Sequence, residues 1–394
     1  MKHTQPWDKR DVEMLAVAFL AGEGNKPKDI AHTLGINAVA VSRHLKRARK
    51  DYLREHIHFI HDSVPRPVMD EVRQRVTNQK LQDQVNDLAK RHNNPREISV
   101  RVFTCGPCSN DLERMAKLGK LSAFLVRNLL LRSRSCGLTW GGSLNGVVMG
   151  LRDLPLPAPW AGQDIECIPL SGEPLTTERA SYSSSNLARD LGIIINGDKY
   201  DAPSLAMVPA FVPDAFKKYE RDGVWRLIEL VEAYTDIFGP HKNGNAVPRG
   251  TKQSTPLAFS LDMILTSVGS RERPLGFGQG VLFDKISVSA RELKSLIVAE
   301  VGGVCIERPK LNAEKSEQLK TVQTSWTGLR KEHLEACAQR GSDLLKGPPG
   351  VVVVSGGAGR AAVICELIKR GLINHLIIDE VLAQELESAS APTR

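Results

Sequence analysis

The stretch "VVVVSGGAGRAAVICELIKRGLINHLIIDE", residues 351–380, constrains the fold more than any other part of the chain. Four valines are followed by a turn with Gly356, Gly357 and Gly359, then by a segment with helical apolar spacing and by a second apolar run. This order predicts a buried strand, a Gly-rich turn, an amphipathic helix and a second buried strand. The stretch alone fits both the cofactor site of an enzyme and the pocket of a sensor.

Short apolar runs alternate with amphipathic segments through the rest of the C-terminal part. The apolar runs are "ISVRVFT", "SCGLTW", "ECIPL", "LGIIIN", "AMVP" and "LDMILTSVG", and the polar segment at 239–256 is predicted to be a surface insertion. Such alternation is typical of a doubly wound, mostly parallel sheet with helices on both faces. We therefore expect residues 55–394 to form an α/β domain.

The N-terminal segment, residues 1–54, has a different character. It holds eleven Lys and Arg against six Asp and Glu, a surplus of five of the chain's eight net positive charges. A basic segment of this kind favours a polyanionic partner, although a solvated helix surface has the same composition.

The same segment has the spacing of a helix-turn-helix. Pro27 suits the first turn of a helix, Gly35 suits its end, and Asn37 suits the cap of a third helix. On that third helix Val41, Leu45 and Ala48 share one face, which predicts that they pack inward. The side chains predicted to face DNA are Asn37, Ser42, Arg43, Lys46, Arg47 and Lys50.

Size and composition limit the remaining classes. The chain of 394 residues has no run of about 18 apolar residues, so no membrane span is expected, and its start lacks an apolar signal core. Seven cysteines, an odd number spread over the chain, favour a reducing compartment over a disulfide framework. We expect a cytoplasmic protein without a cofactor.

Several pieces in order resemble the SorC/DeoR-type bacterial transcription regulators over nearly the whole chain. They are "IAHTLGINAVAVSRHLKRAR", "GLTWGGSLNGVVMGL", "SSSNLARDLG", "DAPSLAMVPAF", "LDMILTSVGS", "VGGVCIERP" and the closing stretch. The resemblance implies an effector domain related to sugar-phosphate isomerases and deaminases. It also implies a homodimer or homotetramer that binds a double-stranded DNA operator under the control of a sugar, a sugar phosphate or a related anion.

Two loops are the predicted effector site. Gly356, Gly357 and Gly359 expose backbone N–H groups at a helix N-terminus, where Arg360 adds a charge-assisted contact to an anion, and Asp379 follows on the next strand. A second strand-to-helix turn offers Thr139, Gly141, Gly142 and Ser143. Loops at the carboxyl ends of parallel strands meet in one crevice. Glycines that merely make tight turns are the competing interpretation.

Three alternatives remain beside this hypothesis. An isomerase- or deaminase-like enzyme with a DNA-binding tail needs a general base, and Asp379 and Glu380 are the acids that the sequence places near the crevice. The segment "GGAGRA" lacks the GxGxxG spacing of a dinucleotide site. The "CGPC" of Cys105 and Cys108 has redox or half-zinc spacing, but without a second half it is interpreted as structural. No catalytic or metal site is therefore predicted.

Overall fold

The computed structural model describes residues 8–22, 25–49, 52–54, 58–59, 64, 68, 72, 78–154, 164–173, 182–198, 200–213, 218–240, 255–269, 288–344 and 347–391. Lys50 lies outside the described residues, as does most of the predicted insertion at 239–256.

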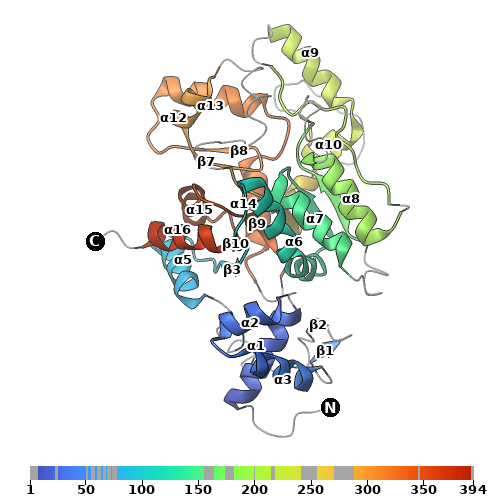
Figure 1. Ribbon diagram of the computed structural model, residues 1–394. Coiled ribbons are helices and arrows are strands. Elements are labelled where there is room, and N and C mark those ends of the chain that lie inside the picture. Colours follow the sequence, from blue (N-terminus) through green and yellow to red (C-terminus); the bar gives the residue numbers. More distant parts are fainter. Residues whose placement is uncertain are drawn as a thin grey trace.

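Three helices form the N-terminal module at the bottom of Figure 1: α1 (Lys9–Gly22), α2 (Pro27–Leu34) and α3 (Ala38–Ala48). Gly35 ends α2 at φ 64°, and the amide of Ile36 donates to the Ala31 carbonyl over 3.0 Å. The Asn37 side chain caps α3 by accepting from the Ala40 amide at 2.8 Å. These turns are the ones that the sequence predicts, and they fold α2 and α3 into a helix-turn-helix.

The module has an apolar core of its own. Almost every residue of α1 from Val12 to Leu20 is buried, and it is met by Ile30 of α2 and by Val41 and Ala48 of α3. Two short antiparallel strands, β1 (Leu53–Arg54) and β2 (His58–Phe59), follow the three helices.

The second part is built on a six-stranded sheet in the order β3-β10-β9-β6-β4-β5, and every adjacent pair is parallel. Its strands are β3 (Ser99–Phe103), β4 (Ser135–Leu138), β5 (Glu166–Pro169), β6 (Met263–Thr266), β9 (Gly350–Ser355) and β10 (His375–Asp379). The doubly wound parallel sheet is thus confirmed, including the strand–turn–helix–strand unit of the closing stretch.

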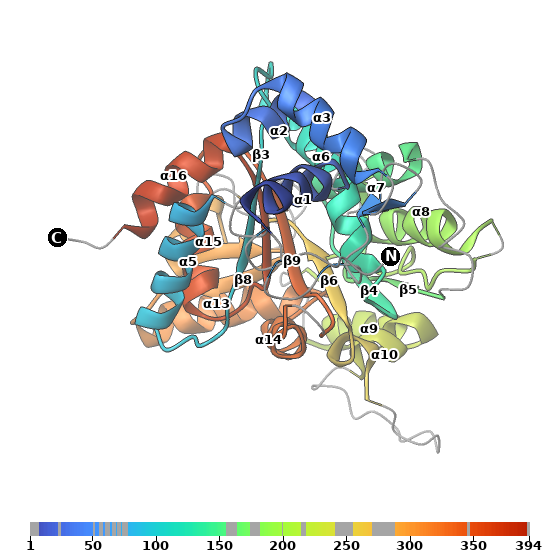
Figure 2. The same ribbon diagram turned by 90° about the horizontal axis from the view of Figure 1, so that it is seen from below.

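Both faces of this sheet are covered. In β9, Val351 and Val353 point into one apolar core, and Val352 and Val354 point into another, because successive side chains of a strand alternate. Figure 2 shows α6–α8 to one side of the strands and α5, α15 and α16 to the other. Burial on two faces is why β9 is an unbroken run of valine rather than an alternating pattern.

The helices of this part are α5 (Gln79–Arg91), α6 (Asp111–Leu130), α7 (Gly142–Asp153), α8 (Ser184–Asn196), α9 (Lys218–Glu229), α10 (Glu232–Phe238), the 3-10 helix η4 (Leu257–Phe259), α12 (Ala290–Leu296), α13 (Ala313–Ser325), α14 (Lys331–Arg340), α15 (Ala361–Lys369) and α16 (Glu380–Ser390). None of the helices among the described residues is both long and apolar enough to span a bilayer.

Two predicted strands are wrong. "LGIIIN" is the last part of α8, where Leu187, Leu191 and Ile195 are buried at helical spacing. "AMVP" is a turn region whose Pro209 forms only an isolated bridge with Glu173. An antiparallel hairpin that the sequence reasoning did not predict lies at β7 (Ile297–Val301) and β8 (Val304–Glu307).

Candidate functional site

The helix α3 presents one exposed polar face. Ser42, Arg43 and Lys46 are exposed, and Val41 and Ala48 are buried on the opposite side. The exposed face begins with Val39, whose side chain is 74% exposed although it is apolar. Spacings of three, four and seven residues from Val39 reach Ser42, Arg43 and Lys46, so these side chains form one surface.

An ion pair and a hydrogen bond fix α3 on α1. The Arg47 guanidinium lies 2.6 Å from Asp11, and the His44 ring is hydrogen-bonded to Glu13 at 2.9 Å. Arg47 remains exposed, but the guanidinium that is predicted to contact DNA is also paired with the Asp11 carboxylate.

The order in which the chain adds strands to the sheet reverses between β4 and β6. From β4 the chain passes through α7 to β5 at one edge of the sheet. From β6 it continues in the opposite direction, to β9 and then β10. Ligands of open α/β sheets bind at such a switch point. Here Thr139 and Thr266 are fully buried, and their hydroxyl groups are hydrogen-bonded at 3.0 Å.

The turn of the β7–β8 hairpin lies against these two threonines. A Cβ atom on Gly302 would come within 2.5 Å of Thr139 and 2.8 Å of Thr266, and φ of Gly302 is +56°. Only glycine fits so close an approach with this backbone conformation. Trp140 packs edge to face on Trp326, with ring centroids 5.1 Å apart. The strand ends are therefore closed by the hairpin and by aromatic rings.

The N-terminus of α7 carries the other predicted residues of the first loop. Gly141 occupies the cap position at φ 134°, which provides no side-chain cap, and Gly142 begins the helix. The Ser143 hydroxyl is buried and has no hydrogen-bond partner among the described residues. Within the same part of the chain, Ser171, just beyond the neighbouring β5, is also buried with an unpartnered hydroxyl, and Glu173 has one unpartnered buried oxygen. Unpaired buried polar atoms are rare enough to require an explanation.

The Gly-rich loop after β9 has a different geometry from the one that the sequence suggests. The amide of Gly357 donates to Asp379 over 3.0 Å, and the amide of Gly359 donates to the Glu385 carboxylate over 2.9 Å. Two of the N–H groups expected to meet an anion thus bind the chain's own carboxylates. The two glycines, at φ 80° and 81°, allow this turn.

Arg360, at the end of that loop, is nearly buried. Its Nη1 donates to the Ala358 carbonyl at 3.1 Å and lies 3.7 Å from Asp111, while its Nε has no partner in the part of the chain that the structure describes. Its role toward an effector stays a prediction, as do those of Gly356, Gly357, Gly359 and Asp379.

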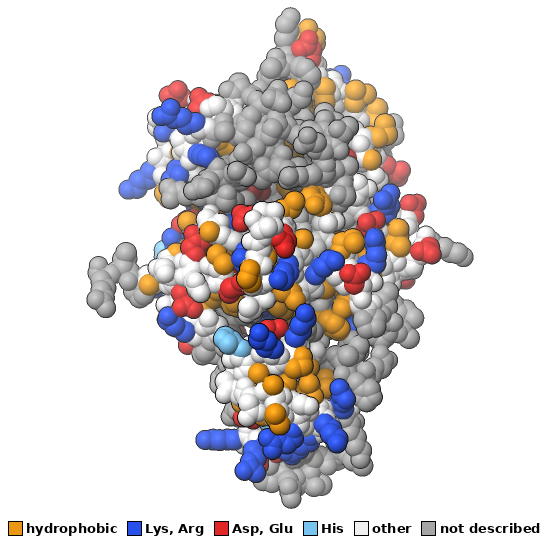
Figure 3. Space-filling model, viewed as in Figure 1, with side chains coloured by type: hydrophobic (Ala, Val, Ile, Leu, Met, Phe, Trp, Pro, Cys, Tyr) orange, Lys and Arg blue, Asp and Glu red, His pale blue; other side chains and the backbone are white. Residues whose placement is uncertain are grey.

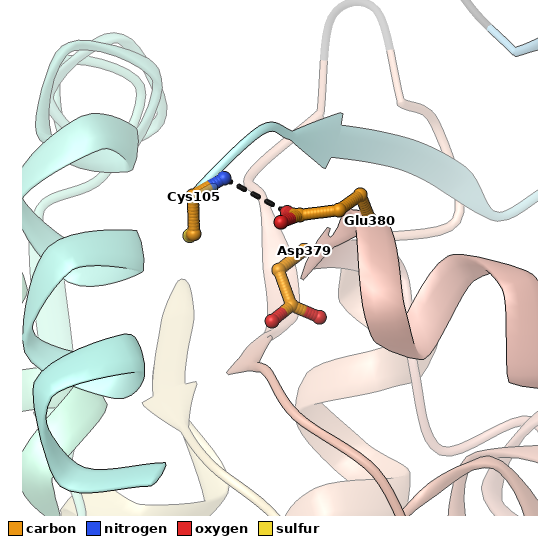
Figure 4. Close-up of side chains that lie close together, drawn as sticks. All are labelled: Cys105, Asp379 and Glu380. Carbon is orange, nitrogen blue, oxygen red and sulfur yellow. Dashed lines mark hydrogen bonds between the residues drawn. The ribbon is translucent and has the colours of Figure 1, made fainter. Parts of the chain in front are cut away.

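A compact polar cluster ties the "CGPC" turn to β10 and α16. The Glu380 carboxylate accepts from the amide of Cys105 at 2.8 Å (Figure 4). It also accepts from the amide of Gly106 at 2.9 Å. Arg114 of α6 donates to both Asp379 and Glu380, at 3.1 and 3.3 Å. Asp379 also caps α16 through the Leu382 amide at 2.9 Å.

The same cluster has ligand atoms of metal-binding type. Cys105, Asp379 and Glu380 offer atoms that lie within 4.8 Å of one another. Burial, and then the neighbouring Glu380, raise the pKa of the Cys105 thiol to about 12, so the thiol is protonated at neutral pH. The carboxylate oxygens are engaged by amides and by Arg114, which accounts for the cluster without a metal ion.

The cysteine pair is therefore expected to be dispensable. A Cys105→Ser/Cys108→Ser variant should fold and bind DNA like the parent, because the Glu380 bonds to this turn come from backbone amides. Intact native protein should also resist alkylation at Cys105 by iodoacetamide at pH 8. Gel shift measures the DNA binding of the variant, and mass spectrometry of peptides measures the alkylation of Cys105. Loss of regulated DNA binding in the double variant would instead reveal a redox role.

The sequence reasoning missed four residues of interest. Ser171 and Glu173 follow the predicted strand "ECIPL", and polar residues just after a buried strand are a usable signal for a site. Thr266 closes β6 in the same way. Val39 gave no signal, because apolar residues are ordinarily assigned to the core.

Solved structures of other proteins share the fold of this chain. No family model matches the sequence, and no curated protein matches it. The full-length sorbitol operon regulator SorC from Klebsiella pneumoniae is similar in structure, with 17% identity and a TM-score of 0.52 over 96% of this chain and 99% of that chain. A transcriptional regulator from Streptococcus pneumoniae TIGR4 has 16% identity and a TM-score of 0.50 over 79% of this chain and 97% of that chain.

Proposed function

We propose that this chain, which has the fold of the SorC-type transcriptional regulators, is itself a cytoplasmic DNA-binding transcriptional regulator controlled by a small metabolite. The observation that carries the proposal is the exposed basic face of α3 on a helix-turn-helix that is joined to an α/β domain. The expected division into a DNA-binding domain, 1–54, and an effector domain, 55–394, is part of this proposal. The apolar core of the first module also includes Val64 and Val72.

In this proposal α3 lies in the major groove of an operator. Arg43 and Lys46 contact base edges, Ser42 and the capping Asn37 add hydrogen bonds, and Arg47 and Lys50 position the protein on phosphates. Val39 lies at the N-terminal end of α3, which is the part of a recognition helix that approaches the bases. Its exposed methyl groups suit contact with the methyl group of thymine.

The effector site is proposed at the strand ends around Thr139, Gly141, Gly142 and Ser143, together with the Gly-rich loop. The unpartnered hydroxyls of Ser143 and Ser171 are groups that a polyhydroxylated ligand pairs with. A sugar fits this chemistry. The amides of Gly357 and Gly359 already donate to carboxylates of the chain. The proposed ligand is therefore one that does not need this loop to bind a phosphate group.

Control of DNA binding requires a connection between the two parts. The Arg101 guanidinium of β3 lies over the Phe19 ring of α1, 5.2 Å from its centroid, and β3 pairs directly with β10. In a homodimer or homotetramer, a small shift transmitted to α1 changes the separation of two recognition helices and therefore the fit to two half-sites.

An active enzyme with a DNA-binding tail is the weaker candidate. Its general base would have to be Asp379 or Glu380, and both carboxylates are held by backbone amides and by Arg114. A base needs a free lone pair within reach of the substrate.

Two measurements test the proposed function. Repeated selection of random duplexes by the full-length protein should enrich one pseudo-palindromic sequence, because paired recognition helices read paired half-sites. Thermal-shift screening with sugars, sugar phosphates and organic acids should then find a ligand that stabilises the protein and alters operator binding. A failure to enrich any sequence contradicts the proposed function.

Replacing Ser143 with alanine is expected to separate ligand binding from folding. The variant removes a buried unpartnered hydroxyl, so its melting temperature should equal or exceed that of the parent. Losing a neutral hydrogen bond of about 0.5–1.5 kcal/mol should weaken ligand binding roughly two- to tenfold in isothermal titration.

The matched control is Ser388→Ala, at an exposed serine of α16. It should leave ligand affinity unchanged. If Ser143→Ala and the parent bind the ligand with equal affinity, the ligand does not bind at the N-terminus of α7.

A further inference from the structure

Helix α9 presents an apolar stripe to solvent. The large apolar side chains of Tyr219 and Leu227, and of Leu230 directly after the helix, are 67%, 66% and 72% exposed. Figure 3 shows apolar side chains gathered on the end of the molecule where Figure 1 places this helix. The opposite side of α9 is anchored, since Trp225 and Ile228 are buried in the main core. The stripe is therefore a fixed surface.

The stripe is symmetric about Gly223. Tyr219 lies four residues before this glycine and Leu227 lies four residues after it, so all three share one helix face. A Cβ atom built on Gly223 would meet no atom of the described residues within 4 Å. The centre of the stripe is therefore open and lacks a side chain, which permits another backbone to approach closely.

We propose that α9 packs antiparallel on α9 of a second copy of this chain, across a twofold axis at Gly223. Antiparallel packing places the residue four before the axis opposite the residue four after it. Tyr219 of each copy then packs on Leu227 of the other, which gives a self-complementary interface of the kind that a twofold axis requires. This contact supplies one interface of the proposed homo-oligomer.

The charges along one flank favour this direction of packing. Asp222 and Arg226 lie four residues apart on the same side of the stripe, and neither forms an ion pair with another described residue. In the antiparallel pair, Arg226 of each copy faces Asp222 of the other. Parallel packing would place the two copies of this flank on opposite sides of the interface, so these pairs would not form.

The size of the helix limits the strength of this contact. A helix of 12 residues is about 18 Å long, so the α9 pair alone buries less than the roughly 1,200 Å² of a stable interface. We therefore expect it to join units that share a further interface, with association that depends on protein concentration.

Cysteine cross-linking tests the register. Packed helix axes are about 8–10 Å apart, so Gly223→Cys on the axis should form a disulfide-linked dimer under mild oxidation. Leu227→Cys alone should not, because its two copies are about 12 Å apart along the axis. Mixing Tyr219→Cys with Leu227→Cys should restore the cross-link. Parent protein and Glu314→Cys, exposed on α13, are the controls for random collision.

The assembly should also depend on the apolar stripe. Leu227→Glu is expected to lower the mass measured by light scattering at high protein concentration, without loss of thermal stability, because this side chain is exposed. The proposal is overturned if Gly223→Cys cross-links no better than Glu314→Cys, or if Leu227→Glu leaves the mass unchanged. Cross-linking needs neither DNA nor effector, so this outcome is independent of whether the proposed regulator function holds.

Discussion

Replacing Arg43 with alanine is expected to abolish discrimination at the base pair that this residue contacts. Arg43 is exposed near the middle of the polar face of α3, where a guanidinium reaches the edge of a guanine. Such a contact contributes about 1–3 kcal/mol of discrimination, so the ratio of specific to random affinity should fall roughly 5- to 150-fold. Gel-shift titration against selected and random duplexes measures this ratio.

The control is Arg49→Ala, which removes the same charge from the end of the same helix. Arg49 is exposed but lies toward the side of the polar face. Its loss should weaken binding to both duplexes about equally and reduce the salt dependence by about one phosphate contact. An Arg43→Ala protein that retains the parent's specificity ratio would show that α3 does not read bases through this residue.

Replacing Arg114 with alanine is expected to cost the α/β domain about 3–5 kcal/mol of its free energy of unfolding. Asp379 is fully buried, and Arg114 is the cation that faces it at 3.1 Å and also contacts Glu380. Removing one partner of a buried ion pair leaves the other charge uncompensated in a medium that solvates it poorly. Urea unfolding followed by circular dichroism measures the loss.

Lys120→Ala provides the comparison. Lys120 lies on the same helix as Arg114, and its ion pair with Asp153 of α7, at 3.5 Å, is exposed. An exposed pair of this kind contributes at most about 1 kcal/mol. If the two variants lose the same stability, Asp379 is not held by Arg114. The difference also bears on the site, since Asp379 fixes the Gly357 amide and therefore the shape of the Gly-rich loop.

Local patterns account for what was predicted correctly. Pro27, Gly35 and Asn37 act on the backbone within a few residues of themselves, so the turn chemistry of the helix-turn-helix is visible without the rest of the chain. The valine run of β9 identifies a strand buried on both faces for the same reason. "LGIIIN" misled because a short apolar run fits a strand and a buried helix end equally well.

The sequence by itself determined the two-part organisation, the basic face of α3 and the strand–turn–helix–strand unit, since each depends on spacing along the chain. Only the tertiary structure decided which groups from distant parts of the chain come into contact. Asp379 and Glu385 accept hydrogen bonds from the amides of the Gly-rich loop. Gly302 packs against Thr139 and Thr266, which lie more than 30 residues away in the sequence. Hydrogen bonds form between any groups that folding brings within about 3 Å, and no local pattern specifies such pairs.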